Sequence, residues 1–181
     1  MGVAINASDG SRSEVASAAV EQLRSSLQGP LLTPDSPAYD EARTIWNAMI
    51  DRRPALIARC TSAADVALVV RFAREHNLVL AVRGGGHNIA GNAVCEGGLL
   101  IDLSQMKAVQ VDQDAKTARV EGGATLADFD REAQAFGLAT PLGINSTTGV
   151  AGLTLGGGFG WLSRRLGLTI DNLLSAEVVT A

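Results

Sequence analysis

A histidine follows three consecutive glycines in the stretch R-G-G-G-H, residues 83–87. Glycine has no Cβ, so successive glycines after a strand expose backbone N–H groups that can converge on an anion such as a nucleotide diphosphate. The neutral imidazole of His87 is a competent nucleophile near pH 7. A plain turn with a histidine that only hydrogen-bonds is the alternative, but a second glycine cluster at 156–158 favours a ligand site.

The two most common nucleotide-binding motifs do not fit these glycines. A dinucleotide motif, G-x-G-x-x-G, needs glycine at its sixth position, but that position is Ile89 when counted from Gly84 and Trp161 when counted from Gly156. A phosphate loop of the G-x-x-x-x-G-K-[ST] type needs a lysine after its last glycine, and neither cluster has one. The glycine clusters therefore predict neither a Rossmann nor a P-loop site.

Strands and helices that alternate along the chain must position these turns. Helical spacing of apolar residues, together with capping residues such as Ser13 and Thr125, predicts helices over 13–27, 64–76 and 126–136, with shorter helical turns at 39–43 and 161–166. Apolar runs or alternation predict strands at 55–58, 79–82, 99–102, 109–111, 117–121 and 175–180. The first two strands and the helix between them form a β-α-β unit, so the pattern predicts an α+β or α/β fold.

Composition limits the classes of partner. The 181 residues carry a net charge of -4 and are only 4% aromatic, which argues against a nucleic-acid partner. The sequence has neither a membrane-spanning apolar run nor a basic-then-apolar signal peptide at its start. Cys60 and Cys95 match no metal-binding or redox spacing, so we interpret them as packing residues of a cytoplasmic protein without a metal site.

Four glycine-bearing segments occur in an order that resembles a known family. They are V-R-G-G-G-H-N-I-A-G (82–91), G-G-L-L-I-D-L (97–103), V-E-G-G-A-T-L (120–126) and the segment 149–173, which begins G-V-A-G-L-T-L-G-G-G-F-G-W. Together they resemble the FAD-binding domain of the vanillyl-alcohol oxidase (PCMH-type) superfamily. The resemblance is strongest to the berberine-bridge-enzyme-like and 6-hydroxy-D-nicotine-oxidase-like FAD-linked oxidoreductases.

This resemblance implies an α+β, two-subdomain, PCMH-type FAD-binding fold that is not a Rossmann fold. Residues 1–32 would be an N-terminal helical extension, and residues 33–181 would be the FAD-binding domain, with its two subdomains split near 84–98. FAD would lie in the cleft between the subdomains, with its diphosphate on backbone amides. The substrate domain of such relatives would be absent from this chain.

The resemblance also assigns residues to the cofactor. The first diphosphate-contacting turn would be Arg83, Gly84, Gly85 and Gly86, with Asn88 on its far side. The second turn against the diphosphate would be lined by Gly149, Gly152, Leu153 and Gly157. The flavin ring would be bordered by Pro141, Leu142 and Gly143, and Thr148 would also bind the cofactor. Val179 would meet the adenine through its main chain.

His87 falls on the position that many relatives join covalently to the 8α-methyl of the flavin. That methyl carbon becomes electrophilic in one tautomer of the ring, and an imidazole nitrogen can attack it. Many relatives also have a cysteine as a second anchor, but here Asn145 occupies that position. The sequence therefore predicts FAD tethered through His87 alone.

The implied reaction is the oxidation of a small-molecule alcohol, amine or sugar-like substrate by hydride transfer to FAD, with dioxygen as the final acceptor. No residue in the chain is a convincing catalytic base, so we expect no catalytic residue here and expect activity to need the further domain. The alternative is a flavin-binding module, or a subunit of a larger dehydrogenase, without activity of its own. The sequence makes no prediction of oligomeric state.

Overall fold

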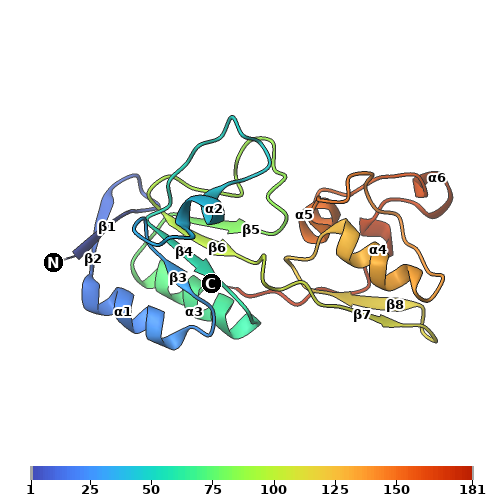
Figure 1. The fold of residues 1–181 in the computed structure, drawn as a ribbon, viewed down its shortest axis with the longest axis horizontal. Helices are drawn as coiled ribbons and strands as arrows, with labels where there is room; N and C mark the ends of the chain where they lie inside the picture. The colour runs from blue at the N-terminus through green and yellow to red at the C-terminus, as the bar shows by residue number, and fades with distance from the viewer. Residues whose placement is uncertain (1, 181) are drawn as a thin grey trace. The chain divides into compact units, whose positions relative to one another are not determined.

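The computed structural model describes residues 2–180, and their contacts divide the chain into two compact units. Unit 1 contains residues up to Arg83, then Asn88–Gln105 and the segment from Val178. Unit 2 contains Gly84–His87 and Met106–Glu177. The chain thus changes unit close to the predicted split at 84–98, and the mixture of helices and strands is α+β (Figure 1).

Unit 1 is built on a four-stranded sheet in the order β3-β4-β6-β5. β4 (Leu56–Arg59), β6 (Leu99–Asp102) and β5 (Leu80–Arg83) are parallel, and β3 (Leu31–Leu32) joins β4 antiparallel. Helix α3 (Ala63–Glu75) connects β4 to β5, and the Ser62 hydroxyl accepts a bond from the N–H of Asp65 at its start. The predicted β-α-β unit therefore exists, but β6 lies between its two strands.

The start of the chain differs from the predicted helical extension. β1 (Gly2–Asn6) and β2 (Arg12–Ala16) form an antiparallel hairpin, and α1 (Ser17–Ser26) begins only after it, so Ser13 is not a helix cap. Gly10, with φ +86°, sits in the connecting turn. Because Asn6 and Gly97 are hydrogen-bonded through their backbones and β3 belongs to the central sheet, residues 2–32 are part of unit 1 rather than an extension before residue 33.

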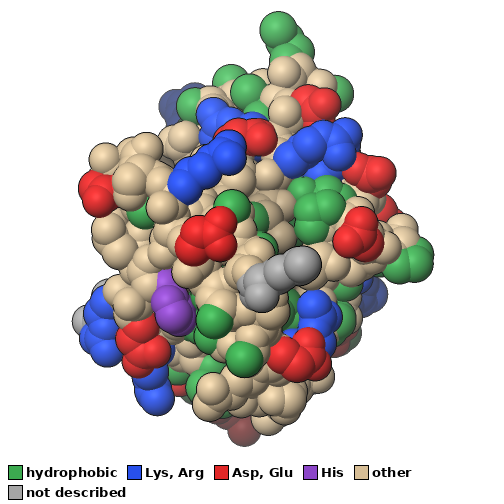
Figure 2. All heavy atoms as spheres, turned by 90° about the vertical axis from the view of Figure 1, so that its left-hand side faces the viewer, with side chains coloured by type: hydrophobic (Ala, Val, Ile, Leu, Met, Phe, Trp, Pro, Cys, Tyr) green, Lys and Arg blue, Asp and Glu red, His purple; other side chains and the backbone are tan. Residues whose placement is uncertain are grey.

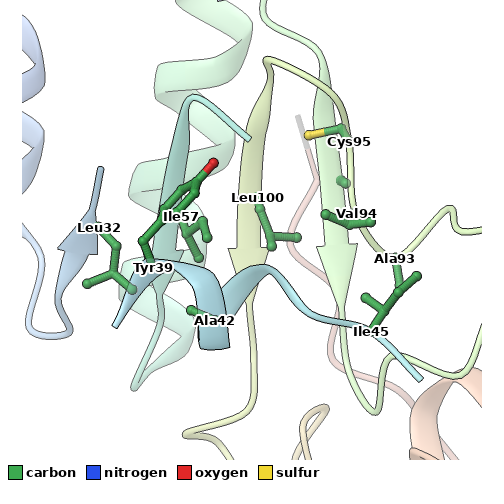
Figure 3. Close-up of a cluster of buried hydrophobic side chains, with 10 residues drawn as sticks. Leu32, Tyr39, Ala42, Ile45, Ile57, Ala93, Val94, Cys95 and Leu100 are labelled. Atoms are coloured by element: carbon green, nitrogen blue, oxygen red, sulfur yellow. The ribbon is translucent and has the colours of Figure 1, made fainter. Parts of the chain in front are cut away.

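The core of unit 1 packs α2 (Tyr39–Arg43) and the segment 93–95 onto one face of this sheet (Figure 3). Tyr39 lies against Ile57 and Leu100 from neighbouring strands, and its hydroxyl donates to the carbonyl of Pro54. Cys95 belongs to the same cluster, and Cys60 is buried elsewhere in unit 1. Burial raises the pKa of Cys60 to about 12 and that of Cys95 to about 11, which agrees with the packing role predicted for both.

Unit 2 consists of a hairpin, short helices and long loops. β7 (Val109–Asp112) and β8 (Thr117–Val120) are antiparallel, and α4 (Leu126–Gln134) packs against β7. Helix α4 begins with a capping box between Thr125 and Asp128, so Thr125 caps this helix as the sequence predicted. The other helices are α5 (Val150–Leu155), α6 (Ser163–Leu166) and a 3-10 turn, Ile170–Asn172.

The strand predicted at 175–180 is wrong, because these residues form no strand and pair with no other strand in the described part of the chain.

Figure 2 shows acidic and basic side chains interspersed over the face in view, without a patch of one sign. Within residues 2–180, no helix has both the length and the apolar character that crossing a membrane requires.

Candidate cofactor site

The first glycine turn packs directly against two other glycine motifs within unit 2. A Cβ built on Gly85 would lie 2.2 Å from the backbone nitrogen of Gly149, and one built on Gly149 would lie 2.4 Å from the nitrogen of Gly85. A Cβ on Gly84 would lie 2.8 Å from the carbonyl oxygen of Gly122. Three of the four glycine-bearing segments therefore meet here, and Gly85 and Gly149 are bare because their backbones touch.

The same turn leaves a row of backbone donors unused. Within unit 2, as far as residues 2–180 are described, no hydrogen bond involves the N–H of Gly84, Gly85 or Gly86. Gly86 is buried and has φ +71°, a conformation that favours glycine. Gly84 and Gly85 are half-buried. Because a buried backbone N–H is nearly always paired, the N–H of Gly86 in particular fits an anionic ligand that supplies the acceptor.

The packing of unit 2 gives no reason for a glycine at position 152. It lies inside α5, where glycine costs about 1 kcal/mol relative to alanine. It is exposed, its φ is not positive, and a Cβ built on it would meet no atom within 4 Å. Gly157 differs, because its φ of +95° already requires glycine. Open space at Gly152 fits a flat ligand lying against bare backbone.

Four of the predicted cofactor-binding residues belong mainly to the packing of unit 2. Leu142 is buried in its core with Leu126 and Phe129, and Leu153 packs against that cluster. Pro141 is buried, and a Cβ on Gly143 would lie 3.2 Å from Leu153 Cδ1. Because the Leu142 side chain is buried, any contact of Leu142 with a cofactor would come from its backbone.

Thr148 also contributes backbone to the structure of unit 2. Its carbonyl accepts from the N–H of Leu126, and its own N–H donates to the carbonyl of Asn145. These two bonds tie the loop before α5 to the start of α4. The loop that contains Asn145 is thereby held in place beside the glycine turn.

The other three predicted residues lie in unit 1. The Arg83 guanidinium is buried, with Nη2 2.8 Å from Asp102 Oδ2 and Nη1 donating to the carbonyl of Thr44, so its charge is neutralised inside unit 1. Asn88 is exposed, and its Oδ1 accepts from the N–H of Asn92. Val179 lies half-buried in the irregular segment at the end of the chain.

His87 ends the glycine turn and contacts a loop of the same unit. Its Nε2 lies 2.9 Å from Thr147 Oγ1, and Thr147 Oγ1 lies 3.0 Å from Asn145 Oδ1. Burial lowers the pKa of His87, which favours the neutral, nucleophilic imidazole. Sequence reasoning identified His87 and Asn145 but missed Thr147, because no local pattern indicates a partner 60 positions away.

The sequence of this chain matches known FAD-binding proteins. A family model described as "FAD binding domain" matches residues 54–181. The chain is 43% identical over 156 residues to (R)-6-hydroxynicotine oxidase of Paenarthrobacter nicotinovorans, covering 86% of this chain and 34% of that protein. It is 40% identical over 158 residues to the uncharacterised FAD-linked oxidoreductase YgaK of Bacillus subtilis, covering 87% of this chain and 35% of that protein.

Solved structures agree with these sequence matches. The crystal structure of 6-hydroxy-D-nicotine oxidase from Arthrobacter nicotinovorans has a TM-score of 0.79 at 42% identity, covering 81% of this chain and 32% of that one. The Physcomitrella patens protein BBE-like 1 has a TM-score of 0.78 at 29% identity, covering 84% and 34%. The predicted PCMH-type FAD-binding fold is therefore confirmed. The chain spans about a third of the length of the curated relatives that it matches.

Proposed function

Because this chain belongs to the FAD-binding domain family of the berberine-bridge-enzyme-like FAD-linked oxidoreductases, we propose that its glycine turn at 84–86 holds the FAD diphosphate and that His87 tethers the flavin. The observation that carries the proposal is the run of three unused N–H groups directly before His87. FAD would supply the redox chemistry, since its ring accepts a hydride. The protein residues bind the cofactor, orient it and provide the nucleophile.

Two features of unit 2 support this assignment independently of the relatives. The three glycine N–H groups can donate to phosphate oxygens without losing any bond that the fold needs. Gly152 offers open backbone where an alanine methyl would fit the fold but would stand in the way of a ligand. Asn145 cannot form a thioether, so the tether would be a single bond to His87.

Attachment is measured on the full 181-residue chain incubated with FAD. The denatured chain is expected to keep flavin fluorescence and to gain the mass of one FAD. His87→Ala should abolish that adduct while the chain stays folded. His76→Ala is the matched control, because this second histidine ends α3 in unit 1, 4.6 Å from the Phe72 ring, and should leave the adduct intact.

The result that contradicts the tether is an adduct that survives His87→Ala. Reversible binding is tested separately by titrating FAD into wild type and Gly152→Ala. The alanine variant should be at least as stable as wild type and bind FAD more weakly. A chain that binds no FAD, or a Gly152→Ala variant with unchanged affinity, would contradict the placement of the cofactor on this backbone.

For the whole protein we propose oxidation of a small-molecule alcohol, amine or sugar-like substrate, with dioxygen as the electron acceptor. Support comes from the names of similar proteins, which include (R)-6-hydroxynicotine oxidase and chitooligosaccharide oxidase. We further propose that the protein acts in the cytoplasm. Anaerobic mixing of the FAD-loaded protein with amines, alcohols and sugars tests the substrate class, because a true substrate bleaches the flavin band and dioxygen restores it. Failure of every class to bleach the band would refute the proposed reaction.

A further inference from the structure

Three residues of unit 2 form a line of hydrogen bonds that ends at the imidazole of His87. Asn145 Oδ1 accepts from both the backbone N–H and the hydroxyl of Thr147, at 3.2 and 3.0 Å. Thr147 Oγ1 in turn lies 2.9 Å from His87 Nε2. The loop that carries Asn145 and Thr147 is fixed to α4 by two backbone bonds, Leu126 N–H to Thr148 and Ala127 N–H to Ser146.

The positions of the protons along this line follow from donor and acceptor chemistry. The Thr147 backbone N–H must face an oxygen, so the Asn145 carboxamide presents Oδ1 rather than its NH₂ group. That oxygen cannot donate, so the contact with Thr147 Oγ1 requires the hydroxyl proton to point at Asn145. Thr147 then meets His87 as an acceptor, and the proton between them belongs to His87 Nε2.

A neutral imidazole carries one proton, so a proton on Nε2 places the nucleophilic lone pair on Nδ1. We propose that Thr147 and Asn145 are positioning residues for flavin attachment, holding His87 in the Nε2–H form so that the bond forms at Nδ1. The proposal rests on the tether of the previous subsection. Many relatives are expected to carry a second flavin anchor at the position of Asn145. The proposal gives this position a different role in this chain.

The attachment step balances with dioxygen as the oxidant. The Nδ1 lone pair of His87 forms the bond to the 8α carbon, which gives up one proton, and Nε2 gives up the other. The two electrons released pass through the flavin to dioxygen, which takes up two protons and leaves as hydrogen peroxide. Once Nε2 has lost its proton it becomes an acceptor, and the Thr147 hydroxyl can rotate from Asn145 to donate to it.

The test compares Thr147→Val with Thr147→Ser in the full chain. Valine keeps the shape of threonine but cannot accept the Nε2–H bond, whereas serine keeps the hydroxyl. The adduct is followed over time by mass after addition of FAD. We expect Thr147→Val to form it roughly tenfold more slowly, the effect of about one lost hydrogen bond, and Thr147→Ser to stay close to wild type.

Two readouts separate positioning from a general structural effect. Reversible FAD affinity should be equal in both variants and wild type, because neither change alters the backbone N–H groups of Gly84, Gly85 and Gly86, which would hold the diphosphate. Nitrogen-15 spectra of labelled histidine in the flavin-free chain should show His87 protonated at Nε2 in wild type and Thr147→Ser, and a mixture of tautomers in Thr147→Val.

The outcomes distinguish this proposal from the tether itself. An adduct that forms equally fast in Thr147→Val, a bond located at Nε2, or a wild-type His87 protonated at Nδ1 would overturn the positioning role while leaving the tether in place. A wild-type chain that forms no adduct refutes the tether, and the nitrogen-15 spectrum then decides the tautomer on its own.

Discussion

Gly85→Ala tests whether contact between two backbones, rather than ligand approach alone, requires glycine in the first turn. The added methyl carbon would lie 2.2 Å from the Gly149 nitrogen, 2.6 Å from its Cα and 3.1 Å from the Thr148 carbonyl carbon. All three are backbone atoms, so no side chain can rotate away to make room. The two turns would have to separate by at least about 1.2 Å to restore ordinary van der Waals contact.

The cost follows from what that separation disturbs. Overpacking an interior usually costs about 1–3 kcal/mol, and a clash between backbones belongs at the upper end of that range. The backbone bonds that place Gly149 are also close by, since Val150 donates to Ala124 and Leu153 donates to Gly149. We therefore expect Gly85→Ala to lower the free energy of unfolding by about 3 kcal/mol.

Urea unfolding followed by circular dichroism measures this loss, with Gly152→Ala as the matched control. The control adds the same methyl group to the same unit, but it meets no atom within 4 Å and should raise stability by up to about 1 kcal/mol through helix propensity. Equal urea midpoints for Gly85→Ala and wild type would refute the contact between the two turns. Equal losses in both variants would show that the effect is not specific to Gly85.

Two further predictions concern buried carboxylates of unit 1. Asp102 is fully buried between Arg83 and Arg59. Asp102→Asn should lower the free energy of unfolding in urea by about 3–5 kcal/mol, because it leaves buried positive charge unpaired. An unchanged urea midpoint would show that these arginines do not need the carboxylate. For Asp65, burial alone would raise the pKa, but bonds from the N–H groups of Thr61, Gln28 and Gly29 and from the Thr61 hydroxyl outweigh it and lower the pKa. The stabilisation from the ionised Asp65 carboxylate should therefore be complete above about pH 4 and be lost as pH falls through the lowered pKa. The free energies of unfolding of wild type and Asp65→Asn should then become equal in acid. A difference between them that stays constant with pH would contradict this reasoning.

Local signals in the sequence predicted the elements that depend on local chemistry. Thr125 caps α4 as expected, and Ser62 caps α3 in the same way, because a hydroxyl can satisfy the N–H groups of the first turn within three residues. The predicted start of α1 was wrong because Val15 and Ala19, four positions apart, fit a helical spacing, although Val15 belongs to β2 and only Ala19 to α1. The Asp9-Gly10 pair, a typical hairpin signal, would have revealed β1 and β2.

Other features depend on partners that no local pattern reveals. Residues 175–180 are rich in β-branched side chains, but a strand needs a neighbouring strand to bond with, and none pairs with them in residues 2–180. The glycines were correctly identified as special, but the contact between Gly85 and Gly149 is tertiary, as is the bond from His87 to Thr147. Arg83 was expected beside a diphosphate, whereas its guanidinium is neutralised by Asp102 in unit 1.

The four residues Gly84–His87 belong to unit 2, although the chain on both sides of them belongs to unit 1. During synthesis they leave the ribosome long before their partners, since Thr147 follows His87 by 60 positions. The sheet strand β5 can therefore form while the turn after it still has nothing to pack against. Closing so long a loop is a slow, non-local event, so the turn should be among the last parts of the chain to become ordered. Competence to take up the cofactor would then coincide with completion of the fold.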